Sequence, residues 1–286
     1  MRGALALGAI ALLAVGTACG ERKEPTGPVV RIYPVTVQGA GDRPAVLQSA
    51  PRRIVPLGPG PRKILRALGL EHRTVTVNDS LVGLSLVAEI RRARPDLIVA
   101  SSDADPLDLA RARSATHAAV YVTPDSSIDD VERAIGDVGL LTGRPVAARK
   151  LTASIEHTRR RVTARLSGSQ VVSTFIDLGS FTTIGSRSLL GDLVVTARGK
   201  DIAGSSPEQG PFPLRRLLKL NPYTYLTTSG SGTTLARLRR DRLTKHLAAV
   251  RSGRFGVLPE RLAQPGPQIG AALEKVARIL HPDAFR

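Results

Sequence analysis

One cysteine occurs in the sequence, and its position would allow its thiol to be modified. Cys19 follows an apolar stretch from about Ala4 to Val15, which begins after a positive charge at Arg2. A charged start, a short apolar middle and a small-residue end are typical of an export signal, and the stretch is too short to span a bilayer. Cleavage before Cys19 would allow acylation of the thiol, so that lipid holds the mature chain at a membrane.

The segment Thr17–Ala18–Cys19–Gly20 resembles the lipobox of bacterial lipoproteins, although Gly16 stands where that motif usually has leucine. Ordinary cleavage after Ala18 is the alternative, and it would leave Cys19 as a free thiol in an exported chain. We predict a signal peptide over residues 1–18, lipidation of Cys19 and an extracytoplasmic, membrane-anchored location.

Catalytic and metal-binding motifs are not evident. No histidine lies within four residues of another or beside the cysteine, so local spacing indicates no metal site; the histidines are His72, His117, His157, His246 and His281. The sequence contains neither a Gly-x-Ser-x-Gly elbow nor a phosphate-binding loop with lysine. We therefore predict a protein that is not an enzyme and that needs no cofactor.

The net charge of +17 and the isoelectric point near 11.2 would suggest nucleic acid as a partner of a cytoplasmic protein. The export signal argues against nucleic acid. The arginines are scattered over several predicted helices, which favours ordinary solvated faces. Attraction to anionic lipid or cell-wall polymer remains an alternative, as does a pocket for an anionic ligand. An exported binder of anionic polymer would gather the charge on one face.

The chain order predicts an α/β protein. Residues 20–28 read as a polar tether, and short strands over 29–35 and 45–48 as a hairpin. Short apolar strands then alternate with helices, which indicates a mainly parallel sheet covered on both faces. The expected strands are 54–57, 74–77, 97–100 and 118–122, and the expected helices are 62–68, 84–93, 106–114 and 129–141.

A second α/β set follows one long helix. Apolar residues recur at helical spacing from Val146 to Leu166 without an interior glycine or proline, and Gly168 ends the segment. The second set has expected strands at 171–178, 223–228 and 254–257, with helices at 189–198, 214–220, 234–238 and 268–280. We expect an N-terminal tether and hairpin over 19–50, lobes over 51–145 and 169–286, and a connecting helix over 146–168.

Several segments resemble the iron-siderophore and vitamin B12 type of substrate-binding protein from ABC importers. They are Pro51–Pro59, Ile64–Leu70, Ile90–Ala100, Leu217–Pro222 and Gln264–Pro267, in this order along nearly all of the mature chain. The resemblance implies two Rossmann-like lobes joined by a single long helix, with a ligand cleft between them. It also implies a monomer that delivers a small-molecule metal chelate to an ABC permease.

Loops that leave the carboxyl ends of parallel strands form the crevice in which ligands bind. On that basis the expected ligand-binding residues are Pro59, Gly60, Asn78, Ser80, Ser102, Asp103, Phe181, Thr182, Arg187, Phe212, Ser229 and Arg261. Phe181 and Phe212 are the aromatic candidates, and Arg187 and Arg261 are the cationic ones.

The resemblance implies that a glutamate on each lobe docks the permease. The first position falls on Ala88, with Glu89 one place later, and the second falls on Arg215. We predict Glu89 as the docking residue. Arg215 reverses the charge of the second position, so a surface lipoprotein used for sensing, adhesion or scaffolding is the alternative to an importer component. A ferric siderophore, haem or cobalamin would fit as the ligand.

Overall fold

The apolar runs after Pro51 form a three-stranded parallel sheet in the computed structural model, which describes residues 32–204 and 209–286. The sheet order is β3-β4-β5, and its strands are β3 (Ile54–Leu57), β4 (Leu97–Ala100) and β5 (Ala119–Val122). The helices of this lobe are α1 (Pro59–Ala67), η1 (Glu71–Arg73), α2 (Gly83–Ala93), α3 (Pro106–Thr116) and α4 (Ile128–Leu141). We call residues 32–141 the N-lobe.

Side chains alternate between two cores on the N-lobe strands. Ile54 and Leu97 pack on one side with residues of α1 and α4, whereas Val55 and Ile98 pack on the other side with residues of α2 and α3. Strand side chains alternate with a period of two, so uninterrupted apolar runs require both faces to be covered. A hairpin of β1 (Val35–Val37) and β2 (Ala45–Leu47) completes the lobe.

The second lobe, residues 169–286 (the C-lobe), contains a four-stranded parallel sheet in the order β11-β10-β6-β8. Its strands are β6 (Val172–Asp177), β8 (Gly199–Asp201), β10 (Thr224–Thr228) and β11 (Phe255–Leu258). Helices α6 (Leu189–Thr196) and α11 (Ile269–Leu280) share a core with one face. The other face shares a core with α7 (Leu214–Leu220), α8 (Leu235–Arg240), η2 (Thr244–His246) and α9 (Ala248–Arg251). Short elements complete the lobe: β7 (Thr182–Thr183), β9 (Gly210–Pro211), α10 (Glu260–Ala263) and η3 (Pro282–Phe285).

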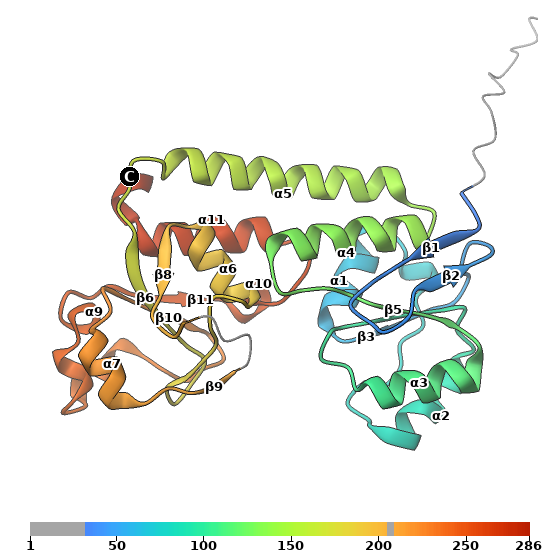
Figure 1. Ribbon diagram of the computed structural model, residues 1–286, viewed down its shortest axis with the longest axis horizontal. Helices are drawn as coiled ribbons and strands as arrows, with labels where there is room; N and C mark the ends of the chain where they lie inside the picture. Colours follow the sequence, from blue (N-terminus) through green and yellow to red (C-terminus); the bar gives the residue numbers. More distant parts are fainter. Residues whose placement is uncertain (1–31, 205–208) are drawn as a thin grey trace, which may run out of the picture. The chain divides into compact units, whose positions relative to one another are not determined.

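The fold prediction is confirmed: two α/β lobes are joined by one long helix (Figure 1). Helix α5 (Pro145–Arg165) begins with proline at its first turn and is unbroken over 21 residues. Ala148, Ile155 and Val162 form its buried seam. The seam packs against α4 of the N-lobe and α11 of the C-lobe, so α5 lies across both lobes.

One strand prediction was wrong, and one strand was missed. Residues 74–77 form only one bridge, in which Val75 N donates to Ile54 O over 2.8 Å, and they do not continue as a strand. Strand β8 was missed: it follows directly after the predicted helix 189–198, and Gly199–Lys200–Asp201 lacks an apolar pattern. Its glycine packs so closely against Val194 and Leu280 that a larger residue would not fit there.

Two glycines of α4 provide a matched test of the seam. A methyl group at Gly139 would overlap Ala148 of α5, whereas nothing lies within 4 Å of the same position at Gly136. We expect Gly139→Ala to lower the free energy of unfolding by about 1–3 kcal/mol, because overpacking separates the two helices. Gly136→Ala should raise it by up to about 1 kcal/mol through helix propensity. Denaturant unfolding of both variants measures this, and equal effects would contradict close contact at the seam.

Candidate functional site

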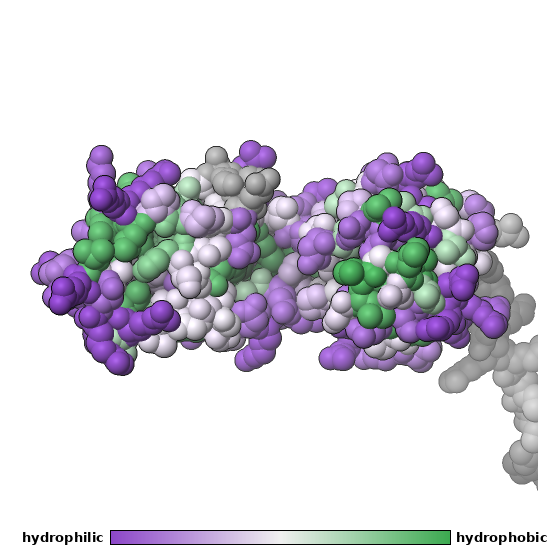
Figure 2. All heavy atoms as spheres, turned by 90° about the horizontal axis from the view of Figure 1, so that it is seen from below, coloured by the Kyte–Doolittle hydropathy of each residue, from purple (hydrophilic) through white to green (hydrophobic). Residues whose placement is uncertain are grey.

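Loops from the carboxyl edges of the two sheets meet between the lobes. Lys63 of α1 donates to Arg261 O over 3.0 Å and to Gln264 Oε1 over 2.6 Å, in the segment that follows β11. At a second point, Ile128 N at the start of α4 donates to Asp192 Oδ2 of α6 over 2.8 Å. Both carboxyl edges therefore border the cleft between the lobes, where the surface is indented in Figure 2. Ligands bind at such edges in parallel α/β sheets.

The N-lobe contributes a pocket of about 370 Å³ at its carboxyl edge. Its walls are mainly apolar and come from the ends of β3 and the starts of α2 and α3: Leu57, Pro59, Leu81, Val82, Leu86 and Leu109. Val82, Leu84 and Leu107 are exposed apolar residues of the same segments, with exposed fractions of 77%, 76% and 57%. This half of the site therefore suits the apolar part of a ligand.

Four aspartates also line the N-lobe pocket, and three of them have partners. Asp79 pairs with Arg62 and accepts from Gly58 N over 2.9 Å, and the Arg62 hydrogen bond lowers the pKa of Asp79. Asp105 caps α3 through Leu107 N, and Asp108 accepts from Gly83 N over 2.6 Å. Asp103 forms no hydrogen bond or ion pair with any residue that the structure describes, and it is exposed. Its carboxylate is thus available to a donor group of a ligand.

The C-lobe contributes a smaller pocket of about 130 Å³ at its own carboxyl edge. Six polar side chains, one aromatic ring and one leucine line it: Asp177, Ser180, Phe181, Thr233, Arg237, Leu238, Asp241 and Thr244. Asp177 is only 1% exposed and accepts from Tyr225 Oη over 2.8 Å, from Thr233 Oγ1 over 2.7 Å and from Gly179 N over 2.9 Å. Burial and the neighbouring Asp177 raise the pKa of Tyr225, so this phenol stays a donor. Through these hydrogen bonds the buried Asp177 carboxylate holds Tyr225, Thr233 and Gly179 in place around the pocket.

The predicted ligand-binding residues fall into several places. Pro59 and Asp103 line the N-lobe pocket, and Phe181 lines the C-lobe pocket. Asn78 and Ser80 form an exposed turn beside the N-lobe pocket, where Ser80 N donates to Asn78 Oδ1 over 3.2 Å.

The remaining candidates of the C-lobe are less close to a pocket. Thr182 pairs with Pro211 in β7 and β9, and Arg187 is exposed. Ser229 Oγ accepts from Glu260 N over 2.9 Å, whereas Arg261 offers its carbonyl to Lys63.

Three expectations about these residues need correction. Phe212 is only 7% exposed and packs on Phe175 with ring centroids 5.3 Å apart, so it belongs to the C-lobe core rather than to the cleft. Gly60 is buried against Pro265 and serves the close approach of the two lobes. Ser102 donates to Asp125 over 2.7 Å and lines a different pocket beside α3.

Sequence reasoning missed Lys63, Asp177 and Arg237. Asp177 had a visible signal, because a carboxylate interrupts the apolar run around Phe175 and Ile176. Lys63 had none, since its partners lie about two hundred residues further along the chain. Burial lowers the pKa of Lys63, and Glu260 opposes this effect.

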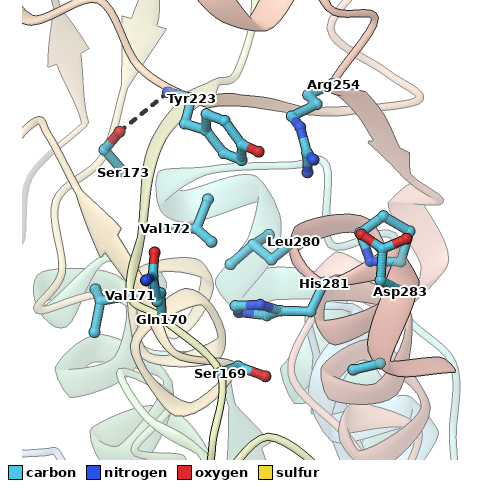
Figure 3. Close-up of a pocket in the computed structure, with 12 residues that line it drawn as sticks. Ser169, Gln170, Val171, Val172, Ser173, Tyr223, Arg254, Leu280, His281 and Asp283 are labelled. Atoms are coloured by element: carbon cyan, nitrogen blue, oxygen red, sulfur yellow. Dashed lines mark hydrogen bonds between the residues drawn. The ribbon is translucent and has the colours of Figure 1, made fainter.

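A larger pocket, of about 550 Å³, lies at the opposite, amino edge of the C-lobe sheet (Figure 3). The Arg254 guanidinium lies 4.1 Å from the Tyr223 ring centroid, and Tyr223 N donates to Ser173 Oγ over 3.0 Å. His281 Nε2 lies 3.0 Å from Ala197 O, and burial lowers the pKa of this imidazole. The His281 contact joins the ends of α6 and α11, and the Tyr223 contacts join residues at the starts of β6, β10 and β11, so we assign the pocket a structural role.

Within residues 32–204 and 209–286, no group of three histidine, cysteine, aspartate or glutamate side chains is arranged to hold a metal ion. In the same part of the chain, no helix is both long and apolar enough to cross a membrane. Cys19 and the predicted signal peptide lie outside the described residues.

Comparison with known proteins defines the class. Residues 87–262 match the family model described as periplasmic binding protein. An uncharacterized ABC transporter substrate-binding lipoprotein of Bacillus subtilis is 23% identical, over 99% of this chain and 97% of its own length. A cobalamin-binding protein of Halobacterium salinarum is 24% identical, over 87% of this chain and 74% of its own length. The crystal structure of Helicobacter pylori CeuE with nickel and histidine superposes with a TM-score of 0.75 at 16% identity, covering 88% of this chain and 89% of that one.

The class of protein is therefore a two-lobed binding protein of the ABC transporter type. The chain belongs to the periplasmic binding protein family, whose members are substrate-binding proteins and not enzymes.

The contact of Lys63 with the C-lobe can be tested directly. We expect Lys63→Met to weaken the contact between the lobes by about 1 kcal/mol, because two hydrogen bonds are lost. Hydrogen exchange should then become faster in residues 259–268. Arg66→Met on the same helix is the control, since Arg66 is exposed and contacts solvent. Equal exchange in both variants would contradict the proposed role of Lys63.

Asp201, at the carboxyl end of β8, predicts a pH effect on stability. Burial raises its pKa from 3.8 to about 6, and Ala203 N donates to the carboxylate over 2.9 Å. The folded chain binds this proton more tightly than the unfolded chain, so the free energy of unfolding should fall as the pH rises between these two values. Asp201→Asn should remove this part of the dependence. Thermal unfolding of both proteins over that pH range measures it; parallel curves would contradict the prediction.

Proposed function

We propose that this protein is the extracytoplasmic solute-binding lipoprotein of an ABC importer. It would bind a ferric siderophore, haem or cobalamin-like chelate between its lobes and deliver it to a permease. The observation that carries the proposal is the pair of half-sites at facing carboxyl edges, in a chain of the periplasmic binding protein family. The cobalamin-binding relative supports the same ligand class. Cys19, acylated after cleavage of residues 1–18, would anchor the chain.

The two half-sites, which are the N-lobe pocket and the C-lobe pocket, differ in chemistry. This difference limits the kinds of ligand that could bind both. The N-lobe half offers apolar walls and the carboxylate of Asp103, whereas the C-lobe half offers Phe181 and the guanidinium of Arg237. A large chelate with an apolar surface, hydrogen-bond donors on one side and acidic groups on the other would satisfy both halves. Such a ligand contacts both lobes only when they are closed, so binding would favour the closed arrangement.

Docking of a permease is the second part of the proposal. Glu89 on α2 is half-buried and pairs with Arg92 over 2.8 Å, which holds the carboxylate at the N-lobe surface. Arg215 on α7 is exposed. A permease that recognises both residues would present a cation to the N-lobe and an anion to the C-lobe.

Ligand binding can be tested with the chain from residue 20 onward and a panel of ferric siderophores, haem and cobalamin. A ligand that binds the folded state raises the melting temperature by mass action. Native mass spectrometry would give the stoichiometry, which should be one ligand per chain. No shift with any compound would favour the alternative of a surface lipoprotein without transport.

A matched pair of aromatic variants locates the binding site. We expect Phe181→Ala to weaken binding of the identified ligand about tenfold, because an aromatic contact in the cleft is lost. Tyr223→Ala should leave affinity unchanged, since Tyr223 lies at the amino edge of the same sheet. Isothermal titration measures both. Loss of affinity only in the Tyr223 variant would move the site to the pocket of Figure 3.

A further inference from the structure

More than half of the net charge of +17 comes from one segment, residues 214–254. Most of the rest comes from residues 142–168, which contain seven lysines and arginines and one acid, Glu156. Residues 32–141 contain 13 lysines and arginines and 13 aspartates and glutamates. Residues 214–254 contain ten lysines and arginines but a single acid, Asp241, while the rest of the C-lobe holds seven of each. Basic residues in this segment therefore have almost no acids beside them in the sequence.

The fold gathers this segment on one side of the C-lobe. Helices α7, α8 and α9 and the turn η2 cover one face of the sheet and share a core with Phe175 and Tyr225 beneath them. Helices α7 and α9 lie at the C-lobe end farthest from the N-lobe (Figure 1). The exposed cations of this segment are Arg215, Arg216, Lys219, Arg237, Arg239, Arg240, Arg242, Lys245 and Arg251, of which Arg237 also lines the C-lobe pocket. We call this surface the cationic face; Figure 2 shows hydrophilic side chains at that end of the molecule.

The cations of this face are not neutralised by acids of the described residues. Elsewhere, arginines pair: Arg159 with Glu156 over 2.5 Å, and Arg161 with Glu274 over 2.7 Å. On the cationic face no lysine or arginine forms an ion pair with an acid within residues 32–204 and 209–286. Asp241 instead accepts from Thr244 N over 2.8 Å and from Leu243 N over 3.0 Å, and these hydrogen bonds lower its pKa. The positive charge is thus available to an external anion.

The composition of the face favours phosphate at a lipid surface. Seven of its nine exposed basic residues are arginines, whose guanidinium groups bind phosphate oxygens in pairs. Apolar side chains are exposed among them, at 42% for Leu220 and 51% for Leu243. Basic and apolar groups together suit the headgroup region of a bilayer. The charge is also spread over four short elements, which fits an extended array of anions better than one small ligand.

We propose that the cationic face docks on an anionic phospholipid bilayer. Of the proposed function, this inference uses only the position of the chain beside a membrane, and it does not depend on the ligand. Residue 32 begins the N-lobe, whereas the cationic face belongs to the C-lobe. A lipid anchor before the N-lobe and a charged contact on the C-lobe would hold the molecule by both lobes and fix the orientation of its cleft toward the membrane.

The test uses the chain from residue 20 onward, which lacks the apolar segment and Cys19 but keeps every core residue described. Vesicles contain equal parts phosphatidylcholine and phosphatidylglycerol, or phosphatidylcholine alone, and co-sedimentation gives the partition coefficient. We expect binding only to the anionic vesicles. The triple variant Arg239→Gln, Arg240→Gln, Arg242→Gln should bind about 100-fold more weakly, at about fivefold per charge.

The matched control removes three exposed arginines of the N-lobe, in the variant Arg52→Gln, Arg66→Gln, Arg91→Gln. It lowers net charge equally and should bind nearly as well as the parent chain. Equal losses in both variants would mean that total charge and not this face drives binding. Absence of binding to anionic vesicles at physiological salt would overturn the proposal and favour an acidic protein surface as the partner. Ligand affinity, measured in parallel, should be unchanged in both variants.

Discussion

The packing of α5 against α4 and α11 is the contact on which the rest of the structure depends. The helix contributes small and aliphatic side chains at a spacing of seven, Ala148, Ile155 and Val162, and glycines oppose them. Gly139 of α4 lies against Ala148, and Gly270 of α11 lies against Ile155 and Thr158. Because these glycines have no side chains, the helices approach closely. The N-lobe packs α4 against α5, and the C-lobe packs α11 against the same helix. The orientation of both sheets follows from this contact.

A shared core limits how the lobes can move. One hydrophobic cluster runs from Ile54 and Leu97 of the N-lobe through Ile155 to Leu193 and Leu273 of the C-lobe. Rotation of one lobe by a large angle would open this cluster, and each aliphatic side chain exposed would cost about 1.5–3 kcal/mol. Small adjustments at the loops, where Lys63 meets Gln264, leave the cluster intact. Closure over a ligand should therefore be small and local to the cleft.

The sequence predicted the elements well where a pattern is local, and less well where it depends on tertiary contacts. Helix α5 was found within one residue at each end, because its apolar spacing is regular and no glycine or proline interrupts it. Phe212, between two prolines, was expected in the cleft, but pairing of β9 with β7 turns it onto Phe175. Lys63 looked like an ordinary helix residue, since its partners come from the other lobe. Local patterns carry no information about such contacts.

The charge of the C-lobe shows why a surface property can differ so strongly between two similar lobes. Helices α7, α8 and α9 are too short to be stable alone, so the core beneath them holds them in place. Leu217, Leu238 and Leu247 are each at most 4% exposed in that core. Repulsion among exposed arginines acts through solvent and is screened by salt, so it costs little beside the burial of these leucines. The fold therefore tolerates many cations without acidic partners on this face. Because folding does not restrict the residue types there, the binding partner of the face can determine them.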